Sequence, residues 1–158
     1  MSKKNENKQG NGSRIFRHGY LVTLLFLTLS GFGQMPIFKR YYIADIPGFG
    51  WLAQFYTTHF IHYVAAIILI TLLSYVIVNH LMANRRYQRV AAAGYLKGVL
   101  LGGIVITGIF LVLRNLKGVT FSPGLITFMD ISHLGFVMIF LMVALYSLLF
   151  KNKWIKTR

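Results

Sequence analysis

The stretch that decides the fold is FYTTHFIHYVAAIILI, residues 55–70, which places His59 and His62 three residues apart. It lies within an apolar run that extends from Trp51 to His80. A run of this length exceeds the roughly 20 residues that a helix needs to cross a bilayer. Ionisable side chains are costly inside a membrane and usually face the interior of a helix bundle. The stretch therefore predicts a membrane-spanning helix that carries a functional site.

The composition of the whole chain is that of a membrane protein. Of its 158 residues, 56% are hydrophobic and only 13% are charged, which is too apolar for a soluble domain. The absence of cysteine excludes disulfides, thiolate metal sites and iron–sulfur ligation by this chain. A net charge of +14 would suggest nucleic acid in a soluble protein, but here the basic residues flank apolar runs. We therefore expect a membrane as the partner, and no nucleic acid.

Four apolar runs have the length of a membrane-spanning helix: Arg17 to Pro36, Trp51 to His80, Tyr95 to Leu113, and Leu125 to Phe150. Within a bilayer only helices and closed barrels satisfy the backbone, and continuous apolar runs of this length are not barrel strands. Short connections favour antiparallel neighbours. The predicted fold class is an all-α membrane protein, an up-down bundle of four transmembrane helices.

The basic residues predict the orientation of this bundle. With the N-terminus inside, thirteen of them lie on the cytoplasmic side and four on the outer side. The positive-inside rule then puts both termini in the cytoplasm. The inner connection, residues 81–94, is basic and Ala-rich and is expected to form a short interfacial helix. The inner residues are Lys3, Lys4, Lys8, Arg14, Arg17, Arg85, Arg86, Arg89, Lys97, Lys151, Lys153, Lys156 and Arg158, and the outer ones are Lys39, Arg40, Arg114 and Lys117.

The first residues of the chain differ from the rest. Met1 to Ser13 is polar, rich in Gly, Asn and Lys, and without apolar periodicity. Such a composition is typical of disorder. The predicted organisation is thus a disordered basic tail over residues 1–13 and a single four-helix domain over residues 14–158.

A third intramembrane histidine, His133, lies at the same predicted depth as His62. His62 is 18 residues from His80 and His133 is 18 residues from Lys151, so both lie about 27 Å from the cytoplasmic flank. Two imidazoles at one level on different helices can bind a haem iron from opposite faces, an arrangement that suits electron transfer. The sequence therefore predicts a haem between helices, with His62 and His133 as iron ligands; the alternative is that each histidine only bonds a neighbouring helix.

Small residues near these histidines would leave room for a porphyrin. Ala65 and Ala66 lie one turn beyond His62, and Gly135 lies two residues beyond His133. We predict that Ala66 and Gly135 border the haem.

Two further residues have two interpretations each, and a third has one. His59, one turn outside His62, is either an interfacial histidine that contacts a haem propionate, water or a partner subunit, or an alternative ligand. Asp130, three residues before His133, either orients that histidine as a hydrogen-bond acceptor or is an acid at the outer rim. His80 is predicted to anchor the end of the second helix at the interface.

Three stretches together resemble a known family: RIFRHGYLVTLLFLTLSGFG (residues 14–33), FIHYVAAIILI (60–70) and ISHLGFVMIFLMVALYSLLF (131–150). The chain resembles the small cytochrome b subunits of respiratory formate dehydrogenases and nickel–iron hydrogenases. Those are four-helix proteins that carry two haems b and pass electrons between a partner's iron–sulfur chain and membrane quinone. The resemblance covers nearly all of residues 14–150.

The family's ligand positions can be followed along this sequence. Its first-helix Arg-x-x-x-His matches Arg14 and His18, and its second-helix histidine matches His62. Its fourth helix usually carries two histidines fourteen residues apart; the first is His133, but the second position holds Ser147. The family's inner haem would join His18 and position 147, and serine is not a usual haem ligand.

These departures leave alternatives open for the inner half of the bundle. The inner haem is absent, or is bound through His18 and an unexpected partner, or is five-coordinate. One haem b is expected, and two are the alternative. A quinone-binding asparagine that the family has before the glycine opening the third helix is replaced here, since Ala91 to Ala93 precede Gly94.

The resemblance implies a haem b membrane subunit of a respiratory oxidoreductase in the bacterial inner membrane. It would relay electrons between an outer-face iron–sulfur or multihaem subunit and membrane quinone. The chain itself is not expected to carry out substrate chemistry, since Glu6, Asp45 and Asp130 are its only acids and no nucleophile–base pair is apparent. Two alternatives are a free-standing transmembrane cytochrome b that acts as a reductase or superoxide oxidase, and a haem-less membrane anchor.

Overall fold

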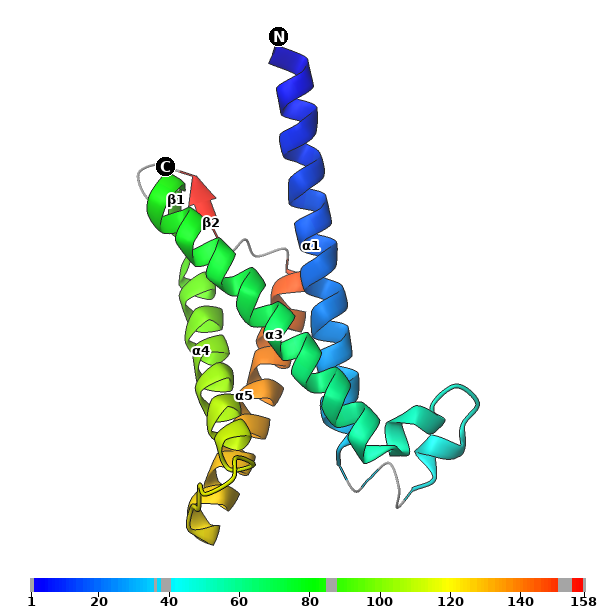
Figure 1. The fold of residues 1–158 in the computed structure, drawn as a ribbon. Coiled ribbons are helices and arrows are strands. Elements are labelled where there is room, and N and C mark those ends of the chain that lie inside the picture. Colours follow the sequence, from blue (N-terminus) through cyan, green and yellow to red (C-terminus); the bar gives the residue numbers. More distant parts are fainter. Residues whose placement is uncertain (1, 36, 38–40, 85–87, 151–154, 158) are drawn as a thin grey trace. The chain divides into compact units, whose positions relative to one another are not determined.

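The structure is a computed structural model that describes residues 2–35, 37, 41–84, 88–150 and 155–157. Most of these residues belong to four long helices, α1 (Ser2–Gly33), α3 (Phe55–Asn79), α4 (Ala92–Leu113) and α5 (Pro123–Leu149) (Figure 1). Each contains a segment long and apolar enough to cross a membrane. The prediction of four spanning helices is confirmed, and they indicate a multi-pass membrane protein.

The chain is organised as two compact units, Met1–Asn79 and His80–Arg158. In the first unit α1 packs against α3, and in the second α4 packs against α5. Both pairs are antiparallel. In the first, the end of α1 meets the start of α3 at Ser30 and His62, while Phe16 and Tyr75 meet farther along, with ring centroids 5.9 Å apart. The prediction of one domain over residues 14–158 stays a prediction.

Helix α1 begins at Ser2 and thus includes most of the segment predicted to be a disordered tail, residues 1–13. No proline, the residue that most strongly interrupts a helix, occurs between Ser2 and Gly33. At its other end the glycine at position 33 fits closely against the following loop. A Cβ atom added there would lie 2.9 Å from Leu52 Cδ2, so this approach needs a residue without a side chain.

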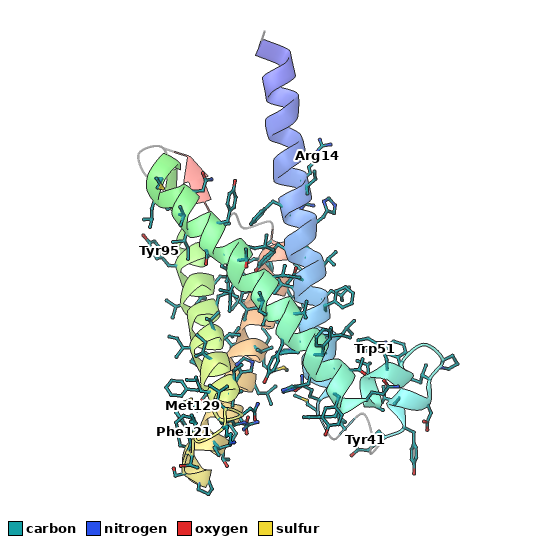
Figure 2. All side chains as sticks on the ribbon, in the orientation of Figure 1. Arg14, Tyr41, Trp51, Tyr95, Phe121 and Met129 are labelled. Atoms are coloured by element: carbon teal, nitrogen blue, oxygen red, sulfur yellow. The ribbon has the colours of Figure 1, made fainter. Side chains whose placement is uncertain are left out.

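The connection between α1 and α3 contains two short 3-10 helices, Ile43–Asp45 and Gly50–Ala53. Figure 2 shows Tyr41 and Trp51 on this connection, at the opposite end of the unit from Arg14. The sequence places Trp51 at the start of a spanning helix, whereas α3 begins at Phe55. The difference arises because Gln54 has an extended backbone, which separates the 3-10 turn from α3.

In the second unit the start of α5 has a well-defined cap. The side chain of Ser122 accepts a hydrogen bond from the Leu125 backbone N–H, and Pro123 occupies the first turn. Both features are typical of helix N-termini. They place the start of α5 two residues before the predicted Leu125. Phe121 and Met129 lie near this end of the α4–α5 pair (Figure 2).

The inner connection differs from its prediction. A turn of π-helix at His80–Asn84 follows α3, and strand β1 (Gln88–Val90) pairs antiparallel with β2 (Ile155–Thr157). The predicted interfacial helix over residues 81–94 is therefore wrong for the described residues, because part of this segment pairs with the C-terminal residues instead. Several residues of the orientation and span predictions lie outside the described residues: Pro36, Lys39, Arg40, Arg85, Arg86, Lys151, Lys153 and Arg158.

Large apolar side chains remain exposed along all four helices, among them Leu25, Ile67, Val99 and Leu148. A soluble protein of this size rarely leaves so much apolar surface uncovered. Lipid would cover these side chains, which agrees with the membrane-spanning length of the helices.

Candidate functional site

In the first unit, His62 on α3 is held by a serine on α1. Ser30 is fully buried, with 0% of its surface exposed, and its Oγ lies 3.0 Å from His62 Nδ1. The same Oγ lies 2.6 Å from the backbone oxygen of Phe26, one turn earlier on α1. The serine therefore connects the backbone of one helix to the histidine ring of the other.

The second contact of Ser30 favours one tautomer of His62. A carbonyl oxygen can only accept a hydrogen bond, so the single hydroxyl proton of Ser30 points to Phe26. A hydroxyl that donates to Phe26 accepts from His62, and this arrangement places the ring proton on Nδ1. In a neutral imidazole this leaves the lone pair on Nε2.

The residue after Ser30 lets the ring lie against α1. A Cβ atom added at Gly31 would lie 3.3 Å from His62 Cε1 and 3.6 Å from Nδ1. The first distance is shorter than most real Cβ contacts. Any larger residue at position 31 would push the imidazole away from the hydroxyl that holds it.

The second unit contains the same arrangement around His133 on α5. Thr107 on α4 is 6% exposed, and its Oγ1 lies 2.7 Å from the Gly103 oxygen and 2.9 Å from His133 Nδ1. A Cβ atom added at Gly108 would lie 3.4 Å from His133 Cε1. The same argument favours a proton on Nδ1 of His133 and a lone pair on Nε2.

We call each of these arrangements a histidine seat: Ser30–Gly31 under His62, and Thr107–Gly108 under His133. In both seats a hydroxyl near the end of the first helix fixes the ring of a histidine near the start of the second. Metal-binding histidines almost always donate their other ring N–H to an oxygen, which fixes the tautomer and the orientation of the ring. Each histidine could thus hold a metal through Nε2, and imidazole nitrogen is a donor that haem iron accepts.

The structure resolves the two interpretations of Asp130. Its carboxylate forms an ion pair with Arg114, at 2.9 and 3.1 Å, while Nδ1 of His133 bonds to Thr107. Asp130 is 47% exposed on its side chain. The interpretation of Asp130 as the acceptor that orients His133 is therefore wrong. The Asp130 carboxylate bonds Arg114, and it is Thr107 that contacts Nδ1 of His133. Asp130 is instead an acid near the end of the helix.

His59 forms a separate contact with α1. Its Nδ1 lies 3.1 Å from Gln34 Oε1, and the amide nitrogen of Gln34 donates to the Ser30 backbone oxygen at 3.3 Å. The ring of His59 stacks on Phe55, with centroids 5.2 Å apart, and lies 4.3 Å from the ring of Tyr63. His59 is thus linked to the seat of His62 through Gln34, and its two predicted roles both stay predictions.

The remaining predicted residues lie apart from the seats. His18 is exposed and its Nδ1 lies 2.7 Å from the Arg14 backbone oxygen, one turn earlier. Ser147 is buried on α5, toward the opposite end of that helix from His133. His80 begins the π-helical turn, and its Nδ1 has no hydrogen-bond partner among the described residues.

The two residues predicted to border a porphyrin, Ala66 and Gly135, differ in their surroundings. Ala66 is partly exposed on α3, next to the buried Ala65. A Cβ atom added at Gly135 would meet nothing within 4 Å. Gly135 therefore has open space beside it, and its role at a haem stays a prediction.

Sequence reasoning missed the hydroxyls of Ser30 and Thr107. The available signal was a repeated dipeptide, Ser30–Gly31 and Thr107–Gly108, near the end of the helix that precedes each histidine-bearing helix. Comparison of the chain with protein-family models, with curated proteins and with solved structures found no match.

Proposed function

We propose that the chain is a haem b membrane subunit of a respiratory oxidoreductase complex, with His62 and His133 as the two axial ligands of one haem. The single observation that carries the proposal is that both intramembrane histidines are seated in the same way. Nδ1 of each lies 3.0 or 2.9 Å from a buried hydroxyl, and donation to that hydroxyl would keep the lone pair on Nε2. A haem bound in this way accepts and releases one electron at a time.

The depth of the two histidines supports a shared haem. Each is 18 residues from the predicted cytoplasmic flank of its helix, about 27 Å at the helical rise. Each also lies near the connected end of its helix pair, toward the loops predicted to face outside. A haem at this level would be close to an electron donor or acceptor on the outer face.

The chain's own residues would bind and orient the haem rather than transform a substrate. The histidines would supply both axial bonds, and the hydroxyls of Ser30 and Thr107 would hold the rings in place. The resemblance to cytochrome b subunits and the positive-inside count support the rest of the proposal: a bacterial inner membrane, both termini in the cytoplasm, an iron–sulfur or multihaem partner outside, and quinone as the membrane-soluble reactant.

The first test is the haem content of the purified chain and of the His18→Ala variant, by pyridine haemochrome and a reduced-minus-oxidised spectrum. We expect one low-spin haem b per chain, unchanged in His18→Ala. Two haems, one of them lost in His18→Ala, would mean that an inner haem is present. Absence of haem in material produced with haem supplied would contradict the proposal and favour a membrane anchor.

The second test concerns the relay itself. In membrane vesicles, quinol should reduce the haem if the chain exchanges electrons with quinone, and an electron-transfer subunit should co-purify with it from native membranes. A haem that reacts with superoxide or metal ions without any co-purifying subunit would instead favour a free-standing cytochrome b.

A further inference from the structure

We propose that Ser30 and Thr107 are positioning residues that set the tautomer and the donor strength of the two haem ligands. This inference rests on the proposed function and names residues beyond the ligands themselves. Two contacts of each hydroxyl support it: the hydroxyl donates to a carbonyl of its own helix, and its oxygen lies within hydrogen-bond distance of the histidine Nδ1.

The geometry leaves each hydroxyl little freedom. Ser30 and Thr107 are both buried, and each donates to a carbonyl one turn earlier at 2.6 and 2.7 Å. A water molecule could not easily replace an acceptor that is fixed in this way between two packed helices. The ring therefore has one favoured orientation, with Nδ1 toward the hydroxyl and Nε2 on the far side.

The same bond alters the chemistry of the ligand. Donation of Nδ1–H to an oxygen raises the basicity of the imidazole, which strengthens its bond to a metal. A stronger donor favours ferric over ferrous haem, and bonds of this kind are among the factors that set haem potentials. Loss of either hydroxyl should thus weaken haem binding and raise the midpoint potential.

The chain offers matched variants for the test. Ser30→Ala and Thr107→Val remove the hydroxyl, while Ser30→Thr and Thr107→Ser keep it. The controls are Thr28→Val on α1 and Thr127→Val on α5. Each of these threonines also donates to a carbonyl one turn earlier, at 2.8 and 3.0 Å, but neither bonds a histidine.

In the haem-loaded full chain, Ser30→Ala and Thr107→Val should each weaken ferric haem binding about 10- to 100-fold. Each tenfold loss of ferric relative to ferrous affinity would raise the midpoint potential by about 59 mV. The variants that keep a hydroxyl, and both controls, should match the wild type. Wild-type affinity and potential in Ser30→Ala and Thr107→Val would overturn the inference even though haem is bound.

A second readout needs no haem. In the apo chain labelled with ¹⁵N-histidine, NMR should show Nδ1–H for His62 and His133, assigned by their loss in His62→Gln and His133→Gln. Ser30→Ala should change the His62 signals, and Thr107→Val those of His133. Nε2–H tautomers in the wild type would overturn the inference, whereas absence of haem binding with the expected tautomers would overturn only the proposed function.

Discussion

A buried hydroxyl such as that of Ser30 contributes little to the stability of a membrane protein. Interhelical hydrogen bonds in membranes average about 0.6 kcal/mol, because the separated helices also find partners. Ser30→Ala and Thr107→Val should therefore fold. Their effects on a bound haem would report on the ligand and not on a general loss of structure.

At the residue scale we first predict that Asp130→Asn leaves the haem unchanged. Asp130 pairs with Arg114 near the helix end, and His133 is held by Thr107. An exposed ion pair contributes at most about 1 kcal/mol, so a slightly lower melting temperature is the only expected effect. The measurement is the haem spectrum together with thermal unfolding, with Arg114→Gln as the matched variant; loss of haem in Asp130→Asn alone would show that Asp130 acts on His133.

The second residue-scale prediction concerns Gly31. In Gly31→Ala the new methyl group would lie 3.3 Å from His62 Cε1, so the ring must move by a few tenths of an ångström. We expect weaker haem binding and an altered low-spin EPR signal. Gly19→Ala, also on α1 but with nothing within 4 Å of the added atom, is the control. An unchanged signal in both variants would mean that the ring does not rest on Gly31 when haem is bound.

His62 and His133 could be chosen from the sequence because an ionisable residue inside an apolar run is conspicuous. Ser30 and Thr107 could not be chosen in the same way. A hydroxyl in a membrane helix usually bonds its own backbone, as Thr28 does, and only the register of the two helices shows which hydroxyl also meets a histidine.

At the scale of the elements, the close approach of α4 and α5 depends on small residues. A Cβ atom added at Gly103 would lie 3.1 Å from three atoms of the Phe136 ring, and the Gly103 carbonyl also accepts the hydroxyl proton of Thr107. Packing in membranes relies on such close contacts, since lipid tails are as apolar as the side chains. Gly103 thus permits the close packing of α4 against α5 and also accepts the hydrogen bond from Thr107, the residue that contacts His133.

We predict that Gly103→Ala loosens this pair. Overpacking of a well-packed contact typically costs about 1–3 kcal/mol, so the variant should unfold at lower temperature or detergent stress than the wild type. Gly102→Ala, the adjacent position with nothing within 4 Å, should be nearly neutral. Equal stability of the two variants would show that Phe136 can move aside at no cost.

The sequence predicted the four spanning helices well and their connections poorly. An apolar run fixes a span because its length must match the bilayer, whichever residues it contains. The segment after α3 instead forms β1, which pairs with residues 155–157 at the other end of the chain. Such a pairing has no local signal. The start of α3 at Phe55 likewise depended on the backbone of Gln54.

At the scale of the whole molecule, the orientation predicted from the basic residues can be tested directly. The chain has no cysteine, so a single introduced one is the only target for a thiol reagent. Ile46 and Met82 are both exposed, one in the connection between α1 and α3 and the other in the π-helical turn. Ile46→Cys should react with a membrane-impermeant maleimide in spheroplasts, and Met82→Cys only after permeabilisation. The reverse pattern would place both termini outside.

At the scale of the whole molecule, the same contact between a buried hydroxyl and a histidine occurs in both units. In each unit a buried hydroxyl contacts Nδ1 of one histidine, and neither unit supplies a second histidine with such a contact within the described residues. In the proposed function, one haem would take His62 and His133 as its two ligands. The proposed function requires that His62 and His133 share this haem.

The measurement that tests it most directly is the low-spin haem content of His62→Ala, His133→Ala and the double variant, with His80→Ala as the control. If one haem is shared, either single variant removes the whole low-spin signal, the double variant removes no more, and His80→Ala keeps it. If each single variant removed half of the signal and the double variant removed all of it, the two histidines would serve different haems and the claim would be wrong.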